Sequence, residues 1–290
     1  MADDRQAFLE RRRKAIGASD VGTIFGLNQY QTPYELWLDK TGRIAPDDDT
    51  NATKFGRFLE SGILDYAESQ LGEIERNVVV PHTSAPLVAT LDGCLQVIPV
   101  EAKTAGLANA FADLSDWGEP ESDEVPAVYL CQVQAQMLCT GADLAYLYAL
   151  IAGRGIVRYQ IPKSAEVGSV IVDRCSEWWE KHVIRDTPPP LDPLPAPEVF
   201  SRVVRQPSKT VELSSDVTAW LHAQSLAKDE IKRQKAQVDQ LQSRILASLG
   251  DAEAGNLPDG RRVTYFEQSR KGYMVEPKSF RVMRVKKGRK

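Results

Sequence analysis

The sequence predicts an α/β domain, with a central mixed sheet flanked by helices, followed by a long helix and a basic extension. Apolar residues recur at helical spacing through residues 52–71, whereas short apolar or β-branched runs follow between residues 77 and 100. A proline-dense segment, 188–197, then separates this pattern from a second long helical one, because no helix can cross it. With 290 residues and 42% hydrophobic content, the chain can bury a substantial core.

Capping and stop residues bound the predicted helices. Ser19 or Asp20 would cap a short helix over Val21–Phe25, and Thr32-Pro33 begins a second helix that ends at Gly42. Gly72 ends the third helix. The predicted helices of this domain are residues 21–25, 33–42, 52–71, 127–140 and 167–183.

The strands are predicted from short runs of β-branched or apolar residues between turn residues. Residues 77–81, 87–91 and 95–100 are three consecutive strands, and 143–151 and 155–161 form a hairpin. The acidic segment 106–126 has no periodicity, which predicts a loop over the site.

The chain divides into three predicted parts: a core domain over residues 1–187, a linker over 188–210 and an extension over 211–290. The extension begins with a helix over 214–249, whose thin apolar stripe has a polar middle. Strand-like pieces follow at 262–266 and 280–285.

Charge is unevenly distributed along the chain. The formal net charge is −4, yet residues 261–290 are strongly basic. This end is either a disordered, solubilising tail or a phosphate-facing surface, and charge alone leaves both open. The polar N-terminus and the absence of a long apolar run lead us to expect a cytoplasmic protein.

The cysteine pattern argues against a metal site built on sulfur. The four cysteines form no Cys-x-x-Cys pair and the three histidines are scattered, so structural zinc is not expected. We expect the cysteines to be buried apolar residues in a reducing compartment.

Acidic residues and one lysine form the strongest chemical pattern. Asp92 precedes Glu101 by nine residues, and Glu101 and Lys103 are two apart on a strand, so their side chains leave the same face. Neighbouring carboxylates repel unless a cation lies between them, and hard oxygen ligands favour Mg²⁺ or Mn²⁺. The carbonyl of Ala102 and a third acid, Glu60, could add ligands.

The same pattern also fits a surface hairpin whose glutamate and lysine form a weak ion pair. The apolar strand before Glu101 and the amphipathic helix that carries Glu60 favour a functional site. From composition and spacing alone the two interpretations remain open.

Several ordered motifs extend over about residues 10–160 of the chain. They are Ile16-Gly17-Ala18-Ser19-Asp20, Tyr30 through Gly42, Gly56-x-x-x-Glu60, the Asp92/Glu101/Lys103 set and Tyr129-x-x-Gln132-x-Gln134. Together they resemble the PD-(D/E)xK nuclease superfamily, and more narrowly the YqaJ-type viral recombinases related to phage lambda exonuclease. The resemblance implies a restriction-endonuclease-like core.

This resemblance implies a role for each matching residue. Glu60, Asp92, Glu101, Lys103 and Gln132 would be catalytic, and the metal ligands would be Asp92, Glu101, Ala102 and Glu60. A pocket for the 5′-terminal phosphate would include Arg12, Ser19 and Thr90. Tyr129 would belong to the same phosphate- and DNA-binding set and support the helix that carries Gln132. A one-residue alignment slip would exchange Arg12 for Arg13.

The implied activity is a Mg²⁺-dependent 5′→3′ exonuclease on double-stranded DNA ends, with Mn²⁺ as a substitute. It would leave 3′ single strands for phage-type recombination with a single-strand annealing partner. The relatives form rings of three subunits, so a homotrimer is expected. The alternatives are an endonuclease or Cas4-like nuclease on the same fold, or a catalytically silent DNA-binding protein. The extension would be a DNA clamp, an oligomer contact or a docking site.

Overall fold

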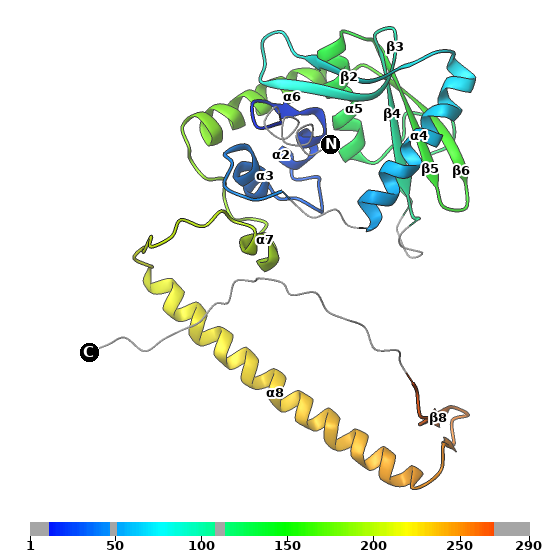
Figure 1. The fold of residues 1–290 in the computed structure, drawn as a ribbon, viewed down its shortest axis with the longest axis vertical. Helices are drawn as coiled ribbons and strands as arrows, with labels where there is room; N and C mark the ends of the chain where they lie inside the picture. Colours follow the sequence, from blue (N-terminus) through cyan, green and yellow to red (C-terminus); the bar gives the residue numbers. More distant parts are fainter. Residues whose placement is uncertain (1–11, 47–50, 108–113, 270–290) are drawn as a thin grey trace. The chain divides into compact units, whose positions relative to one another are not determined.

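The computed structural model describes residues 12–46, 51–107 and 114–269 (Figure 1). The chain forms two compact units, Met1–Arg205 and Gln206–Lys290. The first unit includes the segment after the proline-dense stretch, because Val199 is buried in its core and Val203 pairs with Ile44 in an isolated β-bridge.

The first unit is built on one mixed sheet of six strands. Its main order is β1-β3-β4-β5-β6, and β2 pairs with β3. β1 runs parallel to β3, β4 runs parallel to β5, and the remaining pairs are antiparallel. The predicted mixed sheet is therefore confirmed. The strands are β1 (Ile16–Gly17), β2 (Glu75–Pro81), β3 (Leu87–Leu95), β4 (Ile98–Ala105), β5 (Leu144–Ile151) and β6 (Gly155–Pro162).

Helices cover both faces of the sheet, and the alternation along β5 shows how. Leu147 and Ala149 belong to the apolar cluster shared with α5 (Ala127–Thr140), whereas Tyr148 belongs to the cluster shared with α4 (Asn51–Leu71). Successive strand residues face opposite sides, so a strand buried on both sides is apolar almost throughout. Helices α5 and α4 therefore lie on opposite faces of the sheet (Figure 1).

The remaining helices of the first unit pack on the face that carries α5. Their shared core includes Val21, Leu36, Ile171 and Trp178 together with Leu87, Ala89 and Leu91 of β3. These helices are the short η1 (Ala18–Asp20) and α2 (Val21–Ile24), then α3 (Pro33–Lys40), α6 (Ala165–Trp178), η2 (Trp179–Ile184) and α7 (Pro197–Ser201).

Most predicted helix boundaries are confirmed. Thr32 caps α3 with a complete capping box to Glu35, and Gly42 and Gly72 adopt positive φ angles just beyond α3 and α4. Asp20 is the N-cap residue of α2, one of the two residues predicted for that position, but its side chain does not cap the helix. The carboxylate instead accepts the amide of Gly17 and pairs with two cations.

The strand limits around the acidic residues also differ from the prediction. β3 continues to Leu95, so Asp92 lies inside the strand and not in the turn. The turn consists of Gln96 and Val97, where Gln96 adopts a φ of 59°. β4 begins at Ile98 and runs to Ala105, which places Glu101 and Lys103 within the strand.

The second unit contains a long helix and a small hairpin. Helix α8 spans Ser215–Leu249, and β7 (Ala254–Asn256) pairs with β8 (Arg262–Thr264). The sequence did not predict β7, and the strand predicted at 280–285 lies outside the described residues. No described helix combines the length and apolar composition that a membrane crossing needs.

Candidate active site

The site lies where β3 and β4 separate. β1 pairs with β3 at Leu87 and Val88, and β4 pairs with β3 only from Gly93 onward. In the described chain, the edge of β3 between these two contacts has no strand partner. Asp92 lies in this opening, and its Oδ2 accepts the amide of Ala102 at 3.0 Å. The carboxylate thus takes an amide of the neighbouring strand where regular pairing has ended.

Glu101 is the centre of the hydrogen-bond network. Its side chain is only 1% exposed. Oε1 accepts hydrogen bonds from Lys103 and from Gln132, the latter at 2.6 Å, while Oε2 accepts one from Gln136 at 2.5 Å. A buried carboxylate is tolerated only when its charge is paired and its oxygens are hydrogen-bonded, and Glu101 meets both conditions.

Lys103 leaves the same face of β4 as Glu101, as predicted. Its ammonium pairs with Glu101 and lies 5.3 Å from the ring centroid of Tyr129, which in turn packs against Trp117. The side chain remains 20% exposed. Burial lowers the pKa of Lys103, but the carboxylates of Glu101 and Asp92 outweigh burial and hold the pKa above its ordinary value. Lys103 is therefore a partly exposed, protonated amine beside the two acids.

Two further carboxyl groups show that the site has an excess of negative charge. Burial, followed by the charge of Glu101, raises the pKa of Asp92 to about 8. Burial and Glu101 also raise the pKa of Glu60 on α4, against the opposing effect of Lys103. Three acids thus interact electrostatically with one lysine, and Lys103 does not neutralise all of them.

The raised pKa of Asp92 predicts how stability depends on pH in metal-free protein. In the unfolded chain Asp92 ionises near its ordinary pKa, whereas the folded chain retains the proton up to about pH 8. The folded state is therefore favoured below pH 4 and loses this advantage as the pH rises to about 8. In denaturant unfolding with EDTA, the free energy of unfolding should fall less between pH 4 and pH 8 for Asp92→Asn than for wild type. The exposed control Asp143→Asn should follow wild type, and equal slopes for all three proteins would contradict the assignment.

The donor set suits a hard divalent cation in chemistry, although its ligands are not gathered around one point. Carboxylates and a backbone carbonyl are the ligands that such ions prefer. Within the described residues, no three acidic, histidine or cysteine side chains form a metal-binding group. The local reason is that Lys103, Gln132 and Gln136 already occupy the oxygens of Glu101. Sharing of Glu101 and Asp92 by one ion requires at least one of these donors to move.

The residues predicted for a phosphate pocket are only partly brought together. Arg12 pairs with Asp20 at 2.9 Å and is 37% exposed. Ser19 and Thr90 are exposed, and within the described residues neither side chain is hydrogen-bonded. The guanidinium of Arg13 lies beside Gly42, and its Nε is buried without a partner.

A buried ion pair behind Arg12 was not predicted. Lys40, whose side chain is fully buried, pairs with Asp20 at 2.6 Å and donates to the carbonyl of Arg12 at 2.7 Å. Burial opposes the ionisation of Asp20, but Lys40 and Arg12 outweigh burial and lower its pKa. This network fixes the backbone and the side chain of Arg12 together.

Gln136 is a further site residue that sequence reasoning missed. It is fully buried and bonds to Glu101, while its own Oε1 has no partner. Its position four residues after Gln132 on α5 was a usable signal, because such residues share a helix face. Gln134, part of the quoted motif, instead bridges the carbonyl of Pro162 and the amide of Ser164.

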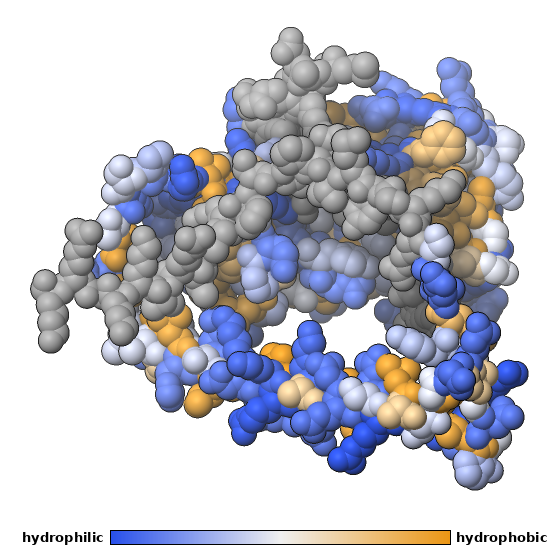
Figure 2. All heavy atoms as spheres, turned by 60° about the horizontal axis from the view of Figure 1, so that its bottom comes forward, coloured by the Kyte–Doolittle hydropathy of each residue, from blue (hydrophilic) through white to orange (hydrophobic). Residues whose placement is uncertain are grey.

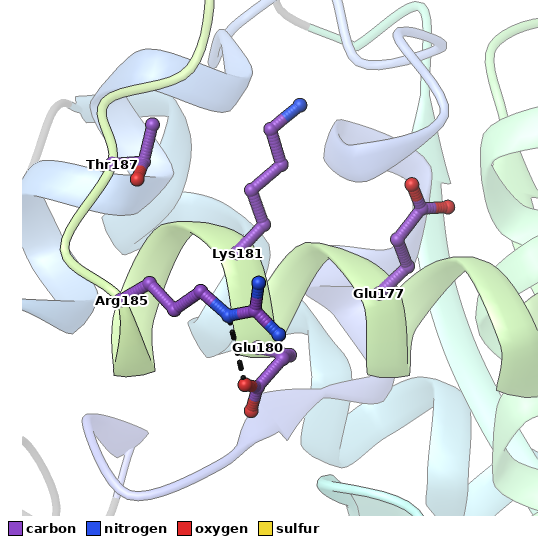
Figure 3. Close-up of a pocket in the computed structure, with 5 residues that line it drawn as sticks. All are labelled: Glu177, Glu180, Lys181, Arg185 and Thr187. Atoms are coloured by element: carbon purple, nitrogen blue, oxygen red, sulfur yellow. Dashed lines mark hydrogen bonds and ion pairs between the residues drawn. The ribbon is translucent and has the colours of Figure 1, made fainter.

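Figure 3 shows a pocket on α6 and η2 that contains none of these residues. Glu177, Glu180, Lys181, Arg185 and Thr187 line it, and Arg185 donates to Glu180 at 3.0 Å. Because two acids and two cations share this lining, the pocket has no clear charge preference for an anionic substrate.

Comparison with known proteins shows what the chain is similar to. Residues 7–143 match the model of the YqaJ-like viral recombinase domain, a range that includes Glu60, Asp92, Glu101, Lys103 and Gln132. The chain is 29% identical to protein YqaJ of Bacillus subtilis (strain 168) over 262 residues, which cover 87% of this chain and 80% of that protein.

Solved structures show which fold the chain shares with known proteins. The structure of LHK-Exo in complex with dAMP matches with a TM-score of 0.50 and 19% identity, covering 62% of this chain and 93% of that one. LHK-Exo is an alkaline exonuclease from Laribacter hongkongensis, and another structure of it matches at 17% identity, with a TM-score of 0.49 and the same coverage. The predicted α/β fold, a central mixed sheet flanked by helices, is shared with the dAMP complex and is confirmed.

Proposed function

We propose that this protein is a divalent-metal-dependent 5′→3′ exonuclease that degrades one strand of duplex DNA from its ends. The observation that carries the proposal is the buried Glu101, bonded to Lys103 and Gln132 beside Asp92 where β3 and β4 separate. The 3′ single strands produced would feed recombination by annealing. The family match and the fold shared with an exonuclease support a nuclease that acts on DNA.

The residues that would hold the cation are Asp92, Glu101, the carbonyl of Ala102 and Glu60. We propose Mg²⁺, with Mn²⁺ as a substitute, because all of these ligands are oxygens. When bound, the ion supplies charge to a scissile phosphate and lowers the pKa of a water molecule. The surplus negative charge, seen in the raised pKa of Asp92 and of Glu60, supports this assignment.

Lys103 orients the attacking water and stabilises negative charge that develops on the phosphate. Its raised pKa favours these roles over removal of a proton, since a protonated amine donates hydrogen bonds and accepts none. The ammonium lies over the ring of Tyr129, and Gln132 and Lys103 both donate to the same oxygen of Glu101. If Lys103 releases this oxygen, Glu101 becomes free to bind the cation and the ammonium becomes free to contact the attacking water or the phosphate.

Arg12 is proposed to bind the 5′-terminal phosphate, with Ser19 and Thr90 as further donors. A guanidinium has five N–H groups, so Arg12 can keep its bond to Asp20 and still present a fork to phosphate. We propose that three subunits form a ring around the DNA. The proposed partner is a single-strand annealing protein. A ring would retain a protein of net charge −4 on DNA by topology.

The test is digestion of end-labelled duplexes with defined 5′ ends in Mg²⁺. We expect nucleotides to be released only from linear DNA, and faster from 5′-phosphorylated ends than from 5′-hydroxyl ends. Arg12→Ala should abolish the preference for phosphate, while the exposed control Arg185→Ala should retain it. Cleavage of covalently closed circles at the rate of linear DNA would contradict an exonuclease, and no cleavage of any DNA would contradict a nuclease.

A further inference from the structure

Helix α8 is long and amphipathic, but its apolar side chains are not buried. None of its 35 residues is buried, and large apolar residues between 50% and 67% exposed interrupt its hydrophilic surface (Figure 2). Helices in proteins gain most of their stability from packing of an apolar face. The apolar residues of α8 therefore call for a packing partner. The residues in this exposure range are Trp220, Leu226, Ile231, Val238, Leu241 and Ile245.

The spacing of these residues, except Leu226, which lies outside the stripe, identifies the geometry of that partner. Val217, Ile231, Val238 and Ile245 share one heptad position, which Gln224 completes, and Trp220 and Leu241 lie three residues later in their heptads. A straight helix drifts by about 20° per heptad from a strict seven-residue repeat. For the apolar residues to face one partner over the four heptads from 217 to 245, α8 must supercoil with a left hand around that partner. The partner is therefore another helix and not a flat surface.

We propose that α8 forms a parallel, in-register coiled coil with α8 of a second copy of this chain. This pairwise contact would join subunits of two rings, because three subunits around a three-fold axis cannot all pair two by two. We call residues 217, 220, 224, 227, 231, 234, 238, 241, 245 and 248 the α8 seam. The a positions of the heptads are Val217, Gln224, Ile231, Val238 and Ile245, and all of these except Gln224 are β-branched. β-branched residues at a positions pack well between parallel helices.

Charge complementarity selects a second copy in parallel. Glu230 occupies a g position and Lys235 the following e position, so an in-register parallel pair places Glu230 of each helix beside Lys235 of the other. The antiparallel arrangement would instead face e positions with e positions, and Lys228 and Lys235 both lie there. Like charges at that site repel, which disfavours the antiparallel pair.

The polar residues in the middle of the seam are compatible with burial between helices. Gln224 accepts a hydrogen bond from Lys228 at 3.0 Å, and Gln234 donates one to Glu230 at 2.8 Å. Each seam amide is thus bonded to a charged residue that flanks the seam. Polar residues at seam positions fix the register of a coiled coil at some expense of stability.

Cysteine cross-linking of the full-length chain tests the proposal. In a parallel, in-register pair the two copies of residue 224 face each other, so Gln224→Cys should form a covalent dimer under mild oxidation. His222→Cys, on the outer surface of the same helix, is the matched control and should give far less dimer. Unsubstituted protein measures any background from the four native cysteines.

A second pair of variants separates the seam from the rest of α8. Adding Ile231→Asp and Val238→Asp to Gln224→Cys should abolish the cross-link, whereas Ala236→Asp and Ser243→Asp on the outer surface should preserve it. The proposal is overturned if Gln224→Cys cross-links no more than His222→Cys, as expected for an antiparallel pair or for an α8 covered by another protein or another segment. It is also overturned if the seam aspartates leave the yield unchanged. DNA cleavage does not enter either readout, so the outcome is independent of the proposed nuclease activity.

Discussion

Replacement of Lys103 by alanine is expected to reduce DNA cleavage by about 10³-fold, the loss typical of a group that stabilises charge or positions a proton in the transition state. The ammonium is the only described cation paired with Glu101, and Tyr129 holds it at the edge of the site. Initial rates on a linear duplex in saturating Mg²⁺ measure the loss. DNA binding, measured by fluorescence anisotropy in Ca²⁺, should change little, because one partly exposed lysine contributes a small part of the phosphate attraction.

The matched control for this variant is Lys163→Ala, since Lys163 is exposed and follows β6. It should cleave at the wild-type rate. Circular dichroism melting of both variants checks the fold, because Lys103→Ala leaves the buried Glu101 without its counter-charge. A folded Lys103→Ala protein that cleaves like wild type would contradict the catalytic role of the lysine.

Replacement of Asp20 by alanine is expected to lower the free energy of unfolding by about 3–5 kcal/mol, the usual cost of removing one partner from a buried ion pair. Lys40 would remain fully buried with its charge unpaired, and Arg12 would lose its only described ion pair. In thermal melts this corresponds to a decrease on the order of 10 °C. If Arg12 binds the 5′ phosphate, preference for phosphorylated ends should also decline, because Asp20 fixes the guanidinium.

Asp186→Ala is the matched control for stability. Asp186 also pairs with an arginine, Arg43, but this pair is exposed and solvent weakens it. The control should melt close to wild type. The ion pair between Asp20 and Lys40 is confirmed as the cause if Asp20→Asn also destabilises the protein, because this variant keeps the shape of the side chain and loses only its charge. Equal melting temperatures for Asp20→Ala and Asp186→Ala would contradict the buried pair.

The acidic residues of the candidate site could be identified from sequence because they follow a local rule. Residues two apart on a strand share a face, so the joint orientation of Glu101 and Lys103 needed no knowledge of the fold. The position of Asp92 did need it. Apolar periodicity ends at Leu91, yet β3 continues to Leu95 because β2 pairs with it up to Cys94. Strand pairing, which is non-local, therefore decided the strand limits.

The buried contacts among polar residues show the same limit. Asp20 occupies a helix-cap position in the sequence, but Lys40, 20 residues away, captures its carboxylate. The bond between Gln136 and Glu101 joins residues 35 positions apart, and only the register of α5 against β4 brings them together. Helix spacing indicates which residues share a face, but not which strand residue that face meets.

The central claim is that the acids where β3 and β4 separate hold a divalent ion. Its most direct test is equilibrium binding of Mn²⁺ to metal-free protein, in which electron paramagnetic resonance measures the free ion. Wild type should bind Mn²⁺ and lose it to excess Mg²⁺. Glu101→Gln, which keeps the shape of the side chain but removes its charge, should lose this binding, and the exposed control Glu166→Gln should retain it. If Glu101→Gln binds Mn²⁺ as tightly as wild type and Glu166→Gln do, the acids where β3 and β4 separate do not hold the ion.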